Sequence, residues 1–191
     1  MLSVNHSVYA EQAMSDRYNG IPYSKLDCQA FVERVLNDCG VRKPDGTAYN
    51  WKGSNDMWRH ALSWKGTLDE CRALYGDIPV GSWVFIVKND GGEKDRGYHD
   101  NEGNATHVGI YCKHTPEQVR DSTRTNKRDG VGYRELKGFT HVGLPNVIDY
   151  SQTTDTKSDA IDAIRVIRTA SSTDSEILEA LQILTTYLKG V

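Results

Sequence analysis

The stretch D-C-Q-A-F-V-E-R-V-L-N-D-C-G, residues 27–40, carries the clearest fold signal in this chain. Its apolar side chains recur three and four positions apart, which predicts an amphipathic helix with one buried stripe. Asp27 is a suitable N-cap, and Gly40 is a suitable stop after the last turn. The pattern therefore predicts a helix over residues 28–39 that has Cys28 as its first residue.

The sequence around this helix divides into a helical part followed by a β-rich part. Further helical patterns cover residues 8–17, 55–64 and 68–75. β-Branched and aromatic runs predict strands over residues 82–88 and 106–112, and weaker strand patterns cover residues 118–122, 132–136, 139–143 and 147–150. Helices that precede strands in this way predict an α+β fold, with N-terminal helices packed on a central antiparallel sheet.

The composition changes near residue 150, which predicts one domain over residues 1–150. The polar stretch S-Q-T-T-D-T-K, residues 151–157, is a predicted linker. Apolar residues then recur at helical spacing over 158–191, and Thr173 and Glu176 fit a capping box. Because the apolar stripe of this C-terminal helical segment needs a cover, we expect it to pack, to form a homo-oligomer or to bind a partner.

Charge and hydropathy exclude several classes of protein. The 191 residues carry a net charge of -3, with a pI of about 6.1, so a sequence-independent nucleic-acid binder is not expected. No apolar run is long enough for a membrane span. The N-terminus M-L-S-V-N-H-S-V-Y-A has no visible signal peptide. This predicts a cytoplasmic protein, one that leaves the cell by another route, or a secreted protein whose leader has been removed.

Cys28 and His107 are the candidates for chemistry. A helix start favours an anion, so it favours a thiolate at Cys28 and can stabilise an oxyanion on an attacked carbonyl. His107 lies in the predicted strand T-H-V-G-I-Y and can act as general base toward the thiol. A third group would orient the imidazole; Asp121 is favoured, and His114 is the alternative. Each residue alone also fits a purely structural role.

D-C-Q-A-F-V followed by T-H-V-G-I-Y resembles the NlpC/p-sixty superfamily of papain-like, cell-wall cysteine peptidases. The late stretch T-H-V-G-L-P-N-V-I-D-Y, residues 140–150, is similar to the closing strand of phage-type members. The resemblance covers about residues 5–150. It implies a papain-like NlpC-type fold and a phage-type lysin that cleaves an amide of the peptidoglycan stem peptide through a cysteine thioester.

The resemblance also implies roles for individual residues. Cys28 matches the family's nucleophile and His107 its base, while Asp27 matches an acidic residue that receives an ammonium group of the stem peptide. Tyr23 stands where the family often has a tyrosine that orients the site. Gln29 departs from the family, which usually has a small residue there, and is a candidate for substrate contact. No metal and no organic cofactor are implied.

Three other interpretations of the sequence compete with a cysteine peptidase. A metal site would use clustered ligand types, namely His99, His107, Cys112 and His114, but their spacing fits no closed zinc pattern. The domain could bind the cell wall without chemistry. It could also be a cytosolic cysteine amidase that acts on substrates other than the wall.

Overall fold

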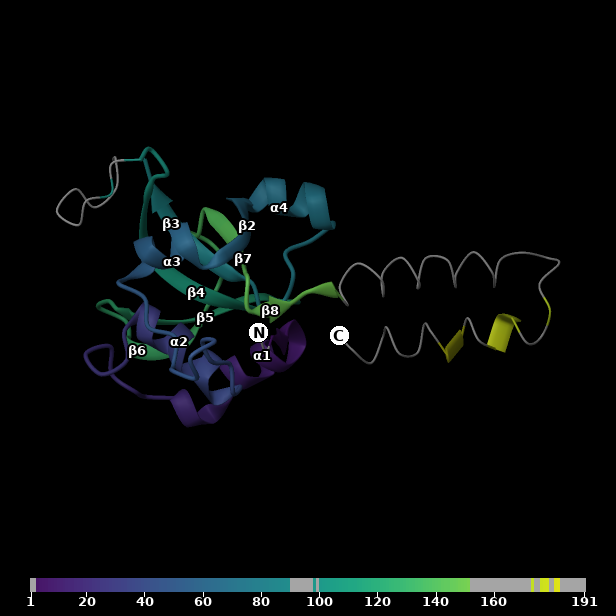
Figure 1. Cartoon of the computed structure of the whole chain (residues 1–191), viewed down its shortest axis with the longest axis horizontal. Helices are drawn as coiled ribbons and strands as arrows, with labels where there is room; N and C mark the ends of the chain where they lie inside the picture. Colours follow the sequence, from purple (N-terminus) through teal and green to yellow (C-terminus); the bar gives the residue numbers. More distant parts are fainter. Residues whose placement is uncertain are drawn as a thin grey trace. The chain divides into compact units, whose positions relative to one another are not determined.

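The computed structural model describes residues 3–89, 98, 100–151, 173, 176–178 and 181–182 (Figure 1). The chain divides into two compact units, Met1–Asp149 and Tyr150–Val191. The first unit contains helices and an antiparallel sheet, which confirms the predicted α+β class. Among the described residues, no helix has the length and apolar character needed to cross a membrane.

The helices of the first unit precede most of its strands. They are α1 (His6–Ala13), a 3₁₀ turn η1 (Asp16–Tyr18), α2 (Cys28–Asp38), α3 (Ser54–His60) and α4 (Leu68–Tyr75). Helix α2 contacts strands β4 and β5 of the sheet, α1 contacts α2 and β4, and α3 contacts β4 (Figure 1). Helix α2 is thereby held against β4 and β5 of the sheet.

The main sheet has the strand order β2-β7-β3-β4-β5-β6, and all of its neighbours are antiparallel. Its strands are β2 (Leu62–Thr67), β3 (Trp83–Lys88), β4 (Asn104–His114), β5 (Glu117–Arg124), β6 (Asp129–Arg134) and β7 (His141–Pro145). Two short strands, β1 (Val4–Asn5) and β8 (Ile148–Asp149), form a separate parallel pair. β4 and β5 are adjacent, so residues from both can meet in one site.

Helix α2 begins and packs as its sequence predicts. The Asp27 side chain accepts a hydrogen bond from the N–H of Ala30 at 2.8 Å, which satisfies one of the free donors of the first turn. Its apolar stripe is fully buried and consists of Phe31, Val32, Val35 and Leu36. Burial of this stripe on the sheet provides most of the stability of so short a helix.

Two of the predicted helices have different bounds in the structure. Residues 55–64 were expected to be one helix, but α3 ends at His60 and residues 62–67 form β2. β2 pairs with β7, far along the chain, and Ser63 Oγ also donates to the Leu144 carbonyl at 3.0 Å. These hydrogen bonds outweigh the local helical pattern. The helix predicted over residues 8–17 begins earlier, because Asn5 accepts hydrogen bonds from Ser7 and Val8.

The loop before α2 is tied to the far edge of the sheet. Ser122 Oγ donates to the Leu26 carbonyl, and the Val131 N–H donates to the Ile21 carbonyl at 3.2 Å. Gly130 has φ of +106°, and a Cβ there would collide with the Ile21 carbonyl, so the close approach requires glycine. The start of α2 is therefore fixed by β5 and β6 as well as by its own cap.

Little of the second unit belongs to the described residues. Residues 176–178 and 181–182 are helical. Thr173 Oγ1 accepts from the Glu176 N–H at 3.3 Å, and the Thr173 N–H donates to Glu176 at 2.7 Å, which confirms the predicted capping box. The predicted linker 151–157, apart from residue 151, and most of the predicted helical segment 158–191 lie outside the described residues.

Candidate active site

Cys28 is the first residue of α2, and 8% of its surface is exposed. The first turn of a helix carries N–H groups that are not used inside the helix, and the dipole is positive at this end. The position therefore suits a sulfur that carries negative charge. All four cysteines of the chain have free thiols.

His107 on β4 and Asp121 on β5 meet between the two strands. His107 Nε2 lies 2.7 Å from Asp121 Oδ2. The Asp121 side chain is fully buried, and that of His107 is 12% exposed. With Nε2 bound to the carboxylate, Nδ1 is the ring nitrogen left for another partner. The strand pairing thus joins the predicted base to its predicted orienting group.

The Cys28 side chain is the other neighbour that acts on the pKa of His107. Burial disfavours the charged imidazolium, but the interactions with Asp121 and Cys28 outweigh it and raise the pKa of His107 to about 9. The imidazole is therefore protonated near neutral pH. Cys28, His107 and Asp121 therefore form one row of interacting side chains, in which His107 and Asp121 are hydrogen-bonded.

Tyr23 belongs to the same group of side chains. Its hydroxyl is close enough to the Cys28 side chain for the two groups to affect each other electrostatically. Burial, followed by the charges of Cys28 and Asp27, raises the pKa of Tyr23 to about 12. The Tyr23 N–H donates to Asp129 Oδ1 at 3.2 Å, which ties the tyrosine to the β5–β6 hairpin. Near neutral pH, the phenol is a hydrogen-bond donor beside the sulfur.

Asp27 and Gln29 flank Cys28 but differ in their surroundings. Asp27 is exposed, so its carboxylate can face a ligand while one oxygen caps α2. The Gln29 amide donates to Glu33 at 2.8 Å and to the Trp51 carbonyl. These bonds hold the loop around Trp51 against α2. The substrate contact expected of Gln29 stays a prediction beside this observed structural contact.

The alternative third residue, His114, lies at the far end of β4. Its Nδ1 is 3.1 Å from Asp77 Oδ2 and 3.3 Å from the Tyr111 hydroxyl. The structure therefore places Asp121, and not His114, beside His107.

Three residues around the row were not anticipated from the sequence. Arg128 contacts Asp121 Oδ1, and Arg134 Nη1 lies 3.6 Å from Asp121 Oδ2. The ring of Phe139 stacks on His107 with centroids 5.8 Å apart. No local pattern separates these arginines from other surface arginines, because their importance comes from the register of β5 and β6.

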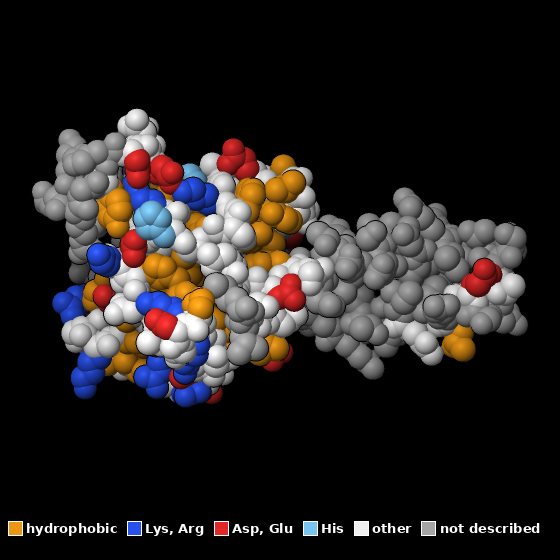
Figure 2. All heavy atoms as spheres, viewed as in Figure 1, with side chains coloured by type: hydrophobic (Ala, Val, Ile, Leu, Met, Phe, Trp, Pro, Cys, Tyr) orange, Lys and Arg blue, Asp and Glu red, His pale blue; other side chains and the backbone are white. Residues whose placement is uncertain are grey.

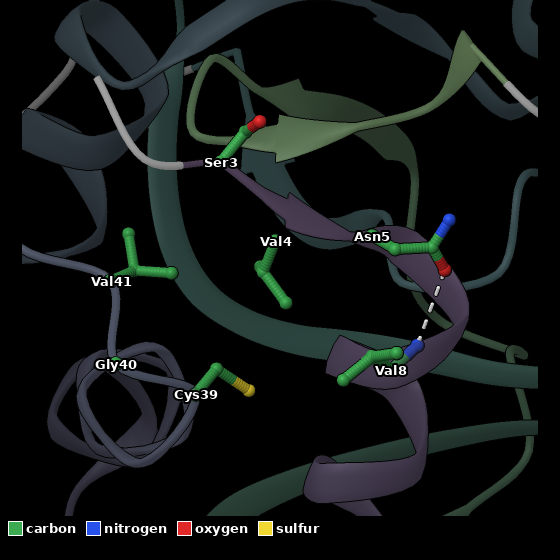
Figure 3. Close-up of a pocket in the computed structure, with 7 residues that line it drawn as sticks. All are labelled: Ser3, Val4, Asn5, Val8, Cys39, Gly40 and Val41. Atoms are coloured by element: carbon green, nitrogen blue, oxygen red, sulfur yellow. Dashed lines mark hydrogen bonds between the residues drawn. The ribbon is translucent and has the colours of Figure 1, made fainter.

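The other thiols have surroundings that suppress reactivity. Burial raises the pKa of Cys39 to about 11 and those of Cys71 and Cys112 to about 12. Cys39 borders an open pocket of about 410 Å³ that is also lined by Val4, Val8 and Val41 (Figure 3). This pocket lies at the C-terminal end of α2, whereas Cys28 lies at the N-terminal end. It is therefore separate from the candidate site.

The described residues that were considered as metal ligands have other partners in the structure. His107 bonds to Asp121, Cys112 Sγ donates to the Ile110 carbonyl at 3.4 Å, and His114 bonds to Asp77. His99 lies outside the described residues. Within the part of the chain that the structure describes, no three His, Cys, Asp or Glu side chains are grouped to hold a metal ion.

Comparison with known proteins gives no relative: no family model, curated protein or solved structure matches this chain.

Proposed function

We propose that the domain is a papain-like cysteine hydrolase of the NlpC/p-sixty type that cleaves an amide bond in the stem peptide of peptidoglycan. The observation that carries the proposal is the row Cys28–His107–Asp121, in which His107 is hydrogen-bonded to the buried Asp121 carboxylate and the cysteine begins a helix. A nucleophile, a base and an orienting group in this order are the parts of nucleophilic acyl transfer.

The first half of the reaction forms a thioester. The Cys28 sulfur attacks the amide carbon, and the carbonyl oxygen becomes an oxyanion. The donors proposed to stabilise this oxyanion are the N–H groups of the first turn of α2 and the Tyr23 hydroxyl. His107 Nδ1 then gives its proton to the leaving nitrogen, the C–N bond breaks, and the amine departs.

The second half releases the acid and restores the enzyme. His107 takes a proton from a water molecule, whose oxygen attacks the thioester carbon. The C–S bond breaks, the product leaves as a carboxylic acid that gives its proton to the solvent, and the sulfur regains its negative charge beside the protonated imidazole. Asp121 keeps Nε2 engaged throughout, so Nδ1 stays directed toward the sulfur.

The choice of peptidoglycan rests on the resemblance of the two motifs and on the charge around the site. The exposed Asp27 carboxylate, next to Cys28, can receive an ammonium group of a stem peptide. Lys and Arg side chains gather on the part of the first unit that holds α2 and β6 (Figure 2). This positive charge suits a substrate that carries carboxylates. The similarity to phage-type members supports a lysin role.

The test is release of stem-peptide fragments from purified peptidoglycan, identified by mass spectrometry. Cys28→Ala is compared with Cys39→Ala, which removes a thiol from the opposite end of the same helix. We expect the unmodified protein and Cys39→Ala to release the same fragments, and Cys28→Ala to release none. Fragments from Cys28→Ala would refute the proposal, as would the absence of fragments from the unmodified protein on walls with different cross-links.

A further inference from the structure

The Asp121 carboxylate is shared by three groups that can carry positive charge. Oδ2 lies 2.7 Å from His107 Nε2 and 3.6 Å from Arg134 Nη1, while Oδ1 is bound by Arg128. The carboxylate is fully buried, and the side chains of Arg128 and Arg134 are 23% and 32% exposed. Because the carboxylate is buried, where the dielectric constant is low, each positive group beside it changes its electrostatic energy more than it would at the protein surface.

The register of the sheet makes room for Arg128. Gly132 on β6 is the direct partner of Asp121 on β5. A Cβ at position 132 would lie 2.8 Å from both Cδ and Nη1 of Arg128. Because Gly132 has no side chain, Arg128 can occupy this space beside Asp121. Arg128 Nη1 also donates to the Tyr133 carbonyl at 2.9 Å, which fixes the guanidinium from a second direction.

Arg134 reaches His107 through two different neighbours. One is Asp121, and the other is Phe139, whose ring centroid lies 4.8 Å from the Arg134 guanidinium carbon. Phe139 in turn stacks on the imidazole with an interplanar angle of 30°. Arg134 Nη2 is held by the Lys137 carbonyl at 3.2 Å. Two of the groups that contact the imidazole are thus held by one arginine.

We propose that Arg128 and Arg134 are positioning residues that act through Asp121 to set the orientation and the basicity of His107. The catalytic role in this inference rests on the proposed function, but the effect of the arginines on the His107 imidazole does not depend on it. Each arginine draws on the charge of the carboxylate and adds positive charge near the ring. Both effects weaken the hold of Asp121 on the proton of His107.

The charged and titratable groups that face His107 come from several elements. Asp121 lies on β5, Arg134 on β6, Arg128 in the turn between them, and Cys28 on α2. Tyr23 and Asp27 adjoin Cys28 from the preceding loop. Because Cys28 is coupled to His107, the imidazole is best titrated in a Cys28→Ala background, where the thiol no longer contributes.

The experiment is a pH titration of His107 by NMR in the full chain with ¹⁵N-labelled histidine, in that background. Arg128→Gln should raise the titration midpoint by about one pH unit, since a positive charge leaves and the carboxylate is freed. Arg128→Lys, which keeps the charge, should stay near the parent. Lys127→Gln is the matched control, because it removes an exposed charge from the neighbouring position of the same turn.

A midpoint in Arg128→Gln that is lowered, or equal to that of Lys127→Gln, would overturn the inference. If Arg128→Gln does not fold, Arg134→Gln decides, with a smaller upward shift expected because of its longer distance to Asp121. The titration needs no substrate. If the midpoint shifts in the Cys28→Ala background while the unmodified protein releases no wall fragments, only the proposed function is refuted. If the midpoint does not shift while the unmodified protein is active, only this inference is refuted.

Discussion

His107 Nε2 and Asp121 Oδ2 are 2.7 Å apart on adjacent antiparallel strands, and the carboxylate is completely buried. This contact gives the imidazole one fixed orientation, in which Nδ1 is the nitrogen available to Cys28. A buried carboxylate with no cation nearby would be costly, and here the imidazole and two arginines supply that charge.

We expect Asp121→Asn to lower kcat about 100-fold, because an amide no longer stabilises the imidazolium that forms during catalysis. It should also destabilise the fold, since Arg128 loses its buried partner. Steady-state rates and denaturant unfolding measure the two effects. The control is Asp69→Asn, which makes the same chemical change at a side chain that is 99% exposed. We expect it to change neither kcat nor the free energy of unfolding. An equal loss in both variants would contradict the role given to Asp121.

The raised pKa of His107 predicts a pH-dependent contribution to stability. The folded pKa of about 9 exceeds the ordinary value of 6.5, so the stabilisation is complete below the lower value and is lost as pH rises through the higher one. The gap in unfolding free energy between the unmodified protein and His107→Gln should therefore shrink from about pH 6 to about pH 10. His60→Gln removes an exposed imidazole as a control. A gap that widened with pH would have the wrong sign.

Gly132→Ala should displace Arg128 without changing any charge. The new methyl would lie 2.8 Å from two Arg128 atoms, so the long side chain must move. We expect a loss of about 1–2 kcal/mol in unfolding free energy. The cost should be smaller in an Arg128→Gln background, where the shorter side chain leaves more room. A double-mutant cycle measures this coupling, and strict additivity would show that Gly132 and Arg128 act independently.

Asp27 has two proposed roles that substitutions can separate. Asp27→Ala removes the cap on Ala30 and should cost about 1 kcal/mol in unfolding free energy. Asp27→Asn retains a capping oxygen but loses the charge, so it should keep stability and raise KM for stem peptides with a free ammonium group. If Asp27→Asn left KM unchanged, Asp27 would be a helix cap only.

The sequence allowed prediction of those parts whose causes are local. The helix beginning at Cys28 has its cap and its apolar stripe within one short stretch, and the strand with His107 is a β-branched run. β2 was not predicted, because its hydrogen bonds come from β7, far along the chain.

The same distinction applies to the site. The motif at Cys28 and the strand with His107 named two of its members, and Asp121 was favoured because it follows on a predicted neighbouring strand. Arg128, Arg134 and Phe139 escaped prediction, since only the pairing of Asp121 with Gly132 places the arginines near the carboxylate. In a hairpin the register is set by the turn type and the loop length, and the weak strand patterns over residues 118–122 and 132–136 defined neither.

The most direct test of the central claim is the rate at which iodoacetamide alkylates each cysteine of the folded protein near neutral pH, read by peptide mass mapping. The account predicts that Cys28 reacts at least about tenfold faster than Cys39, and that His107→Ala removes this difference while Cys39 is unaffected. If Cys28 reacts no faster than Cys39, or keeps its full rate in His107→Ala, then Cys28 is not a nucleophile activated by His107.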